Sequence, residues 1–330
     1  MALPKILADL DLPVVCAPMF IVSGPELVIA QCKAGVVGSF PALNARPQAE
    51  LEKWIVRIKV ELEAWEKETG KKAAPFAVNQ ICHSSNNRLE EDMATCVKHE
   101  VPIIITSLQC IPEVIDATHG YGGIVLHDTV NMRHTRKALG MGVDGIIAVC
   151  HGAGGHAGKL SPFAFIPEVR AEHDGPILMS GSISTGGSVA AALATGADLA
   201  YVGSLFIATE EANATADYKG EVVESSGEDI VYSSLFTGVH GNYLRGSIEK
   251  AGLDPDNLPE ADKSAMNFGS GGNTDAKAWK DIWGAGQGVG SVRAVEPVAD
   301  VVARLRREYE AALARVQRYE SPETVAVAAE

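Results

Sequence analysis

The stretch PILMSGSISTGGSVAAALATGADLAYVGS, residues 176–204, reads as strand, loop, helix, strand and loop. Its apolar runs at 176–181 and 199–204 are short and do not alternate with polar residues, which is typical of strands buried on both faces of a parallel sheet. The small-residue segment 186–196 between them has a helix-like composition. The stretch therefore predicts a strand–helix–strand crossover, the unit from which α/β proteins are built.

The same pattern extends back to the N-terminus. Six further apolar runs lie at 13–19, 36–41, 76–81, 102–108, 123–129 and 145–150, and helix-like segments lie at 25–34, 47–69, 87–100 and 131–142. Eight strands, each followed by a helix or by a loop long enough to hold one, is the count of a (β/α)8 TIM barrel. An open doubly wound sheet is the alternative. We favour the barrel because polar residues follow the strand ends, and a barrel gathers those ends on one face.

Small residues follow the last two predicted strands. Ser180, Gly181 and Ser182 end the seventh strand, and Gly203 and Ser204 end the eighth. Such residues let backbone N–H groups approach an anion closely, and barrels often bind phosphate after these two strands. Either loop alone could be only a tight turn, but two on consecutive units predict a phosphate site.

The pattern changes after the eighth strand. Residues 210–282 are polar and predict a helical insertion with long loops, which would cover the mouth of the barrel. The amphipathic segment 295–317 predicts a closing helix. The sequence thus divides into a barrel, residues 1–209 and 283–320, and an inserted subdomain, residues 210–282.

Composition limits the kinds of partner. The formal net charge is −14 over 330 residues, which argues against a general nucleic-acid or anionic-membrane surface. The six cysteines form no CxxC pair and lie in or beside apolar runs, so we expect buried, reduced thiols. The chain shows no signal-peptide layout and no apolar stretch of membrane-spanning length, which predicts a cytoplasmic protein.

The stretch CHGAGGHAG, residues 150–158, follows the sixth predicted strand and carries His151 and His156. No nearby cysteine or carboxylate completes a metal-ligand set, so we do not expect a metal site. A histidine titrates near neutral pH and can act as a general base on a loop that glycine keeps open to substrate. We assign that role to His156, and a structural role to His151.

Five motifs together resemble the nitronate monooxygenases, formerly called 2-nitropropane dioxygenases. They are CAPM (16–19), VN (78–79), AGGHAG (153–158), the SGS and GS loops (180–182 and 203–204) and IWGAGQG (282–288). The resemblance runs through almost the whole chain and is weakest at 210–280. It implies an FMN-dependent TIM barrel that oxidises alkyl nitronates, such as propionate 3-nitronate, with O2 to a carbonyl compound and nitrite, a detoxification reaction.

The resemblance also implies residue roles. His156 corresponds to the active-site histidine of the family. The residues that would contact FMN are Ala17, Pro18, Met19, Asn79, Ser180, Gly181, Ser182, Gly203, Ser204, Gly286 and Gln287. Within the insertion, His240, Asn242 and Tyr243 could reach over the mouth, although we expect them in a solvated loop.

Four positions depart from the resemblance and leave the substrate open. Phe20 and Ile21 follow CAPM, Asp128 stands where some relatives have lysine, and Leu205 stands where part of the family has arginine. The alternative activity is an NAD(P)H-dependent flavin reductase acting on quinones or an enoyl thioester. A flavin-binding barrel without catalysis is a third hypothesis, and both a monomer and a homodimer are compatible with the sequence.

Overall fold

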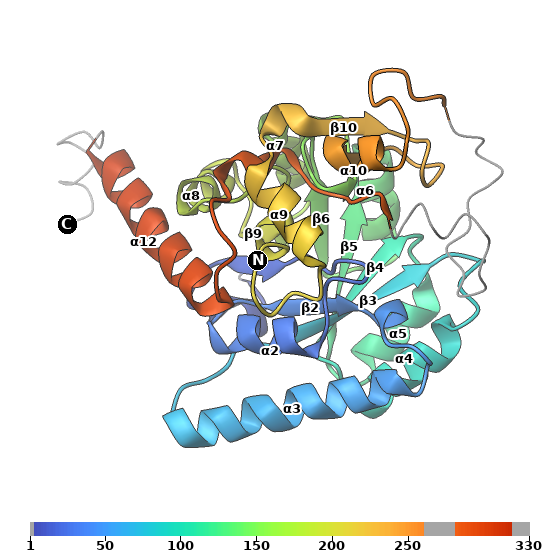
Figure 1. Cartoon of the computed structure of the whole chain (residues 1–330). Helices are drawn as coiled ribbons and strands as arrows, with labels where there is room; N and C mark the ends of the chain where they lie inside the picture. Colours follow the sequence, from blue (N-terminus) through green and yellow to red (C-terminus); the bar gives the residue numbers. More distant parts are fainter. Residues whose placement is uncertain (1–2, 261–280, 319–330) are drawn as a thin grey trace.

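The computed structural model describes residues 3–260 and 281–318, and its centre is an eight-stranded parallel sheet in the order β1-β9-β8-β6-β5-β4-β3-β2 (Figure 1). The two edges meet, because the N–H of Cys16 donates to the carbonyl of Val37 (2.8 Å) and the N–H of Val37 donates to that of Val14 (3.1 Å). The sheet is therefore a closed (β/α)8 barrel, as the apolar runs predicted. Its strands are β1 (Val14–Cys16), β2 (Gly38–Pro41), β3 (Phe76–Cys82), β4 (Ile103–Leu108), β5 (Ile124–Thr129), β6 (Gly145–Val149), β8 (Ile177–Ser180) and β9 (Leu199–Val202).

Successive side chains of each strand enter two different cores. On β6, for example, Ile146 and Ala148 pack outward against the helices, whereas Ile147 belongs to a separate apolar cluster inside the barrel. Because both faces are buried, the strands show continuous hydrophobicity and no alternation. The short helix α1 (Lys5–Ala8) places Leu7 in the inner cluster and so closes the N-terminal end of the barrel. The inner cluster comprises Leu7, Val15, Val37, Ala77, Ile103, Ile105, Leu126, Ile147, Leu178 and Leu199.

The outer helices alternate with the strands along the chain. The predicted helical segments all form helices, and two more, α5 and α7, occupy connections for which only a loop or helix of sufficient length was expected. The long helices α3 and α12 lie on the outside of the barrel (Figure 1). The helices are α2 (Pro25–Lys33), α3 (Glu50–Thr69), α4 (Leu89–Lys98), α5 (Pro112–His119), α6 (Met132–Gly140), α7 (Pro162–Glu172), α8 (Gly186–Ala194) and α12 (Val298–Gln317), with short 3-10 turns η1 (Ala42–Asn44) and η2 (Ser204–Phe206).

The segment after β9 contains strands as well as helices. Helices α9 (Ala216–Glu224) and α10 (Arg245–Lys250) flank the turn η3 (Gly227–Asp229) and the antiparallel strands β10 (Ile230–Ser233) and β11 (Gly241–Leu244). Strand β11 also pairs with β7 (Gly155–His156), which belongs to the loop after β6. The sequence predicted the helices and loops but not this three-stranded sheet. Residues 261–280 of the predicted insertion lie outside the described residues, so the boundary at 282 stays a prediction.

Two further properties of the described residues concern their helices and their cysteines. Within residues 3–260 and 281–318, no helix is both long enough and apolar enough to cross a membrane. All six cysteines are buried and unpaired, as their apolar neighbours predicted. Burial raises the pKa of Cys32, Cys82, Cys96 and Cys150 to about 12, so these thiols stay protonated and unreactive at neutral pH.

Candidate active site

A polar layer lies inside the barrel at the C-terminal ends of the strands, directly above the apolar inner cluster. Side chains alternate between the two faces of a strand, so the residue two positions after an inner apolar side chain also points into the barrel. Asn79 therefore follows Ala77 into the barrel, and its amide donates to the carbonyl of Ile105 (3.1 Å) and to the hydroxyl of Ser107 (2.9 Å). By the same rule the polar layer consists of Asn79, Ser107, Asp128, Ser180 and Tyr201.

Three segments distant in sequence meet above this layer. The N–H of Gly286 donates to the hydroxyl of Ser204 (2.8 Å), and the N–H of Gln287 donates to the carbonyl of Gly152 (2.9 Å). A Cβ on Gly286 would lie 2.4 Å from the Gly152 oxygen, and one on Gly154 would lie 2.7 Å from the Gly286 nitrogen. The C-terminal segment and the loop after β6 therefore approach so closely that only glycine fits at the contact.

The ends of the adjacent strands β8 and β9 present unused backbone donors. Gly181 has φ +127° and Ser182 has φ +55°, so the chain turns sharply after β8. In the described part of the chain, the N–H groups of Ser182, Ile183, Ser204 and Leu205 have no protein acceptor. Ile183 and Leu205 are buried, and a buried N–H without an acceptor is costly. The two strand ends therefore offer an anion the donors that it needs.

The segment after β1 borders the same strand ends. The N–H of Ala17 donates to the carbonyl of Val202 (2.8 Å), and a Cβ on Gly203 would lie 3.4 Å from the Ala17 side chain and 4.0 Å from the sulfur of Met19. The side chain of Asn44 fixes the backbone of Met19, because its amide donates to the Met19 carbonyl (3.0 Å). Ala17, Pro18 and Met19 thus lie beside the end of β9, close to Gly203.

His156 lies on β7 and its ring packs against the insertion. Its Nε2 is 3.2 Å from the hydroxyl of Thr237, in the loop between β10 and β11. Burial lowers the pKa of His156, and the carboxylate of Asp128 opposes that effect without cancelling it. His156 is therefore neutral at pH 7, which is the state that a general base requires.

His151 lies in a different environment from His156. It is exposed, and its backbone N–H donates to the carbonyl of Leu160 (2.8 Å). Across residues 3–260 and 281–318, no three side chains among His, Cys, Asp and Glu are grouped to hold a metal ion.

The insertion contributes more to the site than we expected. Asn242 and Tyr243 are buried in β11, and the Asn242 amide donates to the carbonyl of Ala153 (2.7 Å). The prediction that these two residues belong to a solvated loop is wrong, because pairing with β7 draws them under the AGGHAG loop. His240, by contrast, is exposed, and its ring stacks on Tyr232 with centroids 5.0 Å apart.

Sequence reasoning missed Tyr201 and Thr237. Tyr201 is an inward position of β9, and its place two residues after Leu199 could have identified it. Burial, and then the negative charge of Asp128, raise the pKa of Tyr201, so its hydroxyl stays protonated. Thr237 carries no sequence signal, because its role depends on a contact with a residue 81 positions away.

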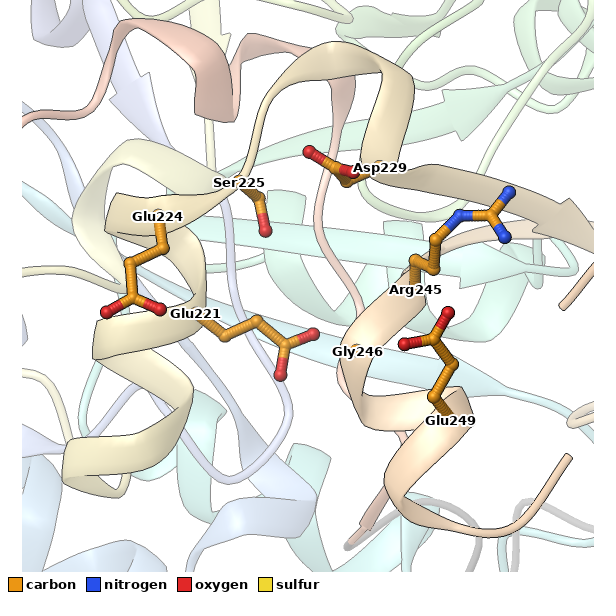
Figure 2. Close-up of a pocket in the computed structure, with 7 residues that line it drawn as sticks. All are labelled: Glu221, Glu224, Ser225, Asp229, Arg245, Gly246 and Glu249. Carbon is orange, nitrogen blue, oxygen red and sulfur yellow. The ribbon is translucent and has the colours of Figure 1, made fainter.

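A separate cavity of about 240 Å³ lies between α9 and α10 (Figure 2). Two of its charged groups bind other residues: Arg245 binds Asp256 through two hydrogen bonds (2.9 and 3.1 Å), and Glu221 accepts from the N–H of Ser247 (2.8 Å). None of the predicted site residues lines it. Its lining residues are Glu221, Glu224, Ser225, Asp229, Arg245, Gly246 and Glu249.

The fold is a (β/α)8 barrel whose two adjacent strand ends carry backbone N–H groups without a protein acceptor in the described residues, and whose loop after β6 carries a histidine of lowered pKa. The family model for nitronate monooxygenase matches residues 4–308. The chain belongs to the nitronate monooxygenase family, and it is therefore an oxidoreductase.

Individual relatives agree with this assignment. The nitronate monooxygenase of Paraburkholderia phytofirmans is 26% identical over 95% of this chain and 96% of its own length. Protein Rv1533 of Mycobacterium tuberculosis is 32% identical, but the match covers 44% of this chain and only 40% of that protein.

Among solved structures, the nitroalkane oxidase of Streptomyces ansochromogenes has a TM-score of 0.76 at 23% identity, covering 95% of this chain and 100% of that one. FabK of Thermotoga maritima also has a TM-score of 0.76, at 21% identity and 96% and 98% coverage. At these identities the structures support the fold alone.

Proposed function

We propose that this protein oxidises alkyl nitronates, such as propionate 3-nitronate, with O2 to a carbonyl compound and nitrite, using FMN. The observation that carries the proposal is the neutral His156 held above a barrel mouth whose two neighbouring strand ends offer unused anion donors. Family membership supports nitronate chemistry in general.

The residues present fit FMN. Its phosphate would accept from the free N–H groups after β8 and β9 and from the hydroxyls of Ser180, Ser182 and Ser204, where Gly181 and Gly203 allow close approach. Ala17, Pro18 and Met19 would contact the ring system, with Gly286 and Gln287 on the returning C-terminal segment. Asn79 would hydrogen-bond the polar edge of the ring. When bound, FMN supplies the redox chemistry of the reaction.

The protein's own part is proton transfer and positioning. His156 is neutral, so it can accept the proton from the carbon next to a nitro group and convert a nitroalkane into the nitronate. A protonated His156 would instead stabilise the nitronate anion, but its lowered pKa disfavours that state at neutral pH. The residues of β11 and of the C-terminal segment close over the loop that carries His156 and limit the access of water to it.

The experiment is anaerobic stopped-flow mixing of the FMN-loaded protein with propionate 3-nitronate and, separately, with NADH and NADPH. We expect the nitronate to change the flavin absorbance and the nicotinamides to leave it unchanged. Rapid bleaching by NADH or NADPH alone would assign the protein to the flavin reductases instead. Failure to take up FMN would overturn both activities.

A histidine variant tests the role of His156. Because a positioned general base contributes about 10²–10⁴-fold, His156→Asn should lower turnover of a neutral nitroalkane by that factor. It should have a smaller effect on a nitronate that is supplied already deprotonated. His151→Asn is the matched control, since that exposed side chain lies on the same loop, and it should behave as the wild type. Equal losses on nitroalkane and nitronate would contradict the role of His156 as a base.

A further inference from the structure

The insertion supplies a hydroxyl to the ring of His156. Thr237 is buried in the loop between β10 and β11, and its Oγ1 lies 3.2 Å from His156 Nε2. The neighbouring strands β11 and β7 pair through Gly241 with His156 and Asn242 with Gly155, so the loop and the histidine are fixed to the same small sheet.

The Thr237 hydroxyl donates its single proton to the carbonyl oxygen of Val239. Its oxygen lies 2.8 Å from the carbonyl oxygen of Val239, and a carbonyl can only accept. Without a donated hydroxyl proton, two oxygen lone pairs would face each other at that distance. The hydroxyl also accepts from the N–H of Val239 (3.2 Å). With that proton donated to Val239, the oxygen can only accept from His156 Nε2, which lies 3.2 Å away.

The loop around Thr237 is held in place by its own contacts. The N–H of Gly238 donates to the carbonyl of Ser234 (2.9 Å), and Gly238 has φ +76°, as a tight turn requires. The ring of Phe236 packs edge-on against the buried Tyr243, with centroids 4.9 Å apart. These contacts hold the Thr237 side chain beside His156, and the carbonyl of Val239 takes its hydroxyl proton.

We propose that Thr237 is a positioning residue that fixes neutral His156 as the Nε2–H tautomer and leaves the lone pair on Nδ1 as the basic atom. An acceptor opposite Nε2 requires a proton on Nε2, and a neutral imidazole carries only one ring proton. The two nitrogens point in different directions, so the basic atom faces away from Thr237. The insertion therefore selects which nitrogen takes the substrate proton. This inference rests on the proposed role of His156 as the base.

The test begins with the tautomer itself, measured by long-range ¹H–¹⁵N correlation spectra of the FMN-loaded protein labelled with ¹⁵N-histidine. His156→Asn identifies the resonances. We expect wild type and Thr237→Ser to show the Nε2–H pattern, because serine keeps the hydroxyl. Thr237→Val keeps the shape but cannot accept, so its His156 should show a mixture of both tautomers.

Turnover of a nitroalkane supplies the second readout. Thr237→Val should lower kcat by roughly fivefold to tenfold, the factor that corresponds to one net hydrogen bond, with little change in KM. Thr237→Ser should restore most of the rate. Ser233→Ala is the matched control, because it removes a side-chain hydrogen bond to the N–H of Leu235 in the same loop without touching His156, and its rate should match the wild type.

Three results would overturn the inference: an Nδ1–H tautomer in the wild type, an unchanged tautomer in Thr237→Val, or equal rate losses in Thr237→Val, Thr237→Ser and Ser233→Ala. The last would mean that the loop is only structural. If the spectra follow the expectation but no nitro compound is oxidised, the proposed function fails while the tautomer assignment stands. The two failures are thus distinguishable.

Discussion

At the scale of single residues, burial and the charge of Asp128 have opposing effects on the pKa of His156. Burial favours the neutral imidazole because the charged form loses its hydration, and the carboxylate on β5 favours the charged form through Coulomb attraction. Burial is the larger effect, so the pKa lies below its ordinary value. His156 is hydrated in the unfolded state and therefore takes up a proton there more readily than in the folded state. Its contribution to the free energy of unfolding is therefore lost as the pH falls below the ordinary pKa of histidine.

The first residue-scale prediction follows from this balance. The rate of a step that needs neutral His156 falls as the pH drops through its folded-state pKa and is constant above it. Asp128→Asn removes the charge that raises this pKa, so the acidic limb of the kcat/KM profile should move to lower pH. Profiles with a nitroalkane between about pH 5 and 8 measure the shift. Asp116→Asn, the same change on the exposed face of α5, should leave the profile in place. An unmoved profile in Asp128→Asn would show that the two side chains do not interact.

At the scale of elements, the site depends on backbone contacts between loops that no single element contains. The C-terminal segment crosses the loop after β6 at Gly154 and Gly286, where an added Cβ would overlap backbone atoms, and at Gly152, where it would overlap the side chains of Ser182 and Gln287. Glycine at these positions is required by the close approach of the segments, in addition to any demand for unusual φ.

Gly286→Ala tests this contact. A Cβ 2.4 Å from the carbonyl of Gly152 must push the two segments apart, and overpacking of this kind costs about 1–3 kcal/mol. We expect a lower thermal midpoint and weaker FMN retention, measured by calorimetry and by flavin absorbance after dialysis. Gly220→Ala is the control, because nothing lies within 4 Å of a Cβ there, and in helix α9 it should stabilise by about 0.5–1 kcal/mol. Normal FMN retention in Gly286→Ala would show that the segments separate without disturbing the site.

At the scale of the whole molecule, the two concentric cores bury every cysteine. All six thiols should therefore react slowly with an aromatic disulfide reagent in the native protein and quickly after unfolding in guanidinium chloride. Absorbance of the released thiolate counts them, and no thiol should react in the fast phase of the native protein. A fast native thiol would identify an opening motion at that position. Reducing agents should leave the thermal midpoint unchanged, since no disulfide is present to break.

The sequence by itself determined a parallel α/β sheet with both faces buried, because eight apolar runs are each separated from the next by a connection that holds a helix. Polar residues at the strand ends favoured a closed barrel over an open doubly wound sheet, and the structure confirms the closure. Small residues after β8 and β9 also predict an anion site there, because the capacity of backbone N–H groups to approach an anion depends on local composition, and this site stays a prediction. Helices α5 and α7 were not predicted individually; α7 contains Pro167, a residue that disfavours a helix interior.

Only the tertiary structure decided how the site is completed. The strands β10 and β11 are short, and β7 has two residues, so none has a periodicity that sequence analysis can detect. Their pairing buries Asn242 and Tyr243 and brings Thr237 to His156 across 81 positions. The charge on His156 likewise depends on burial and on Asp128, which lies on another strand. Local patterns specify elements, whereas the protonation and orientation of a side chain depend on neighbours that only folding brings together.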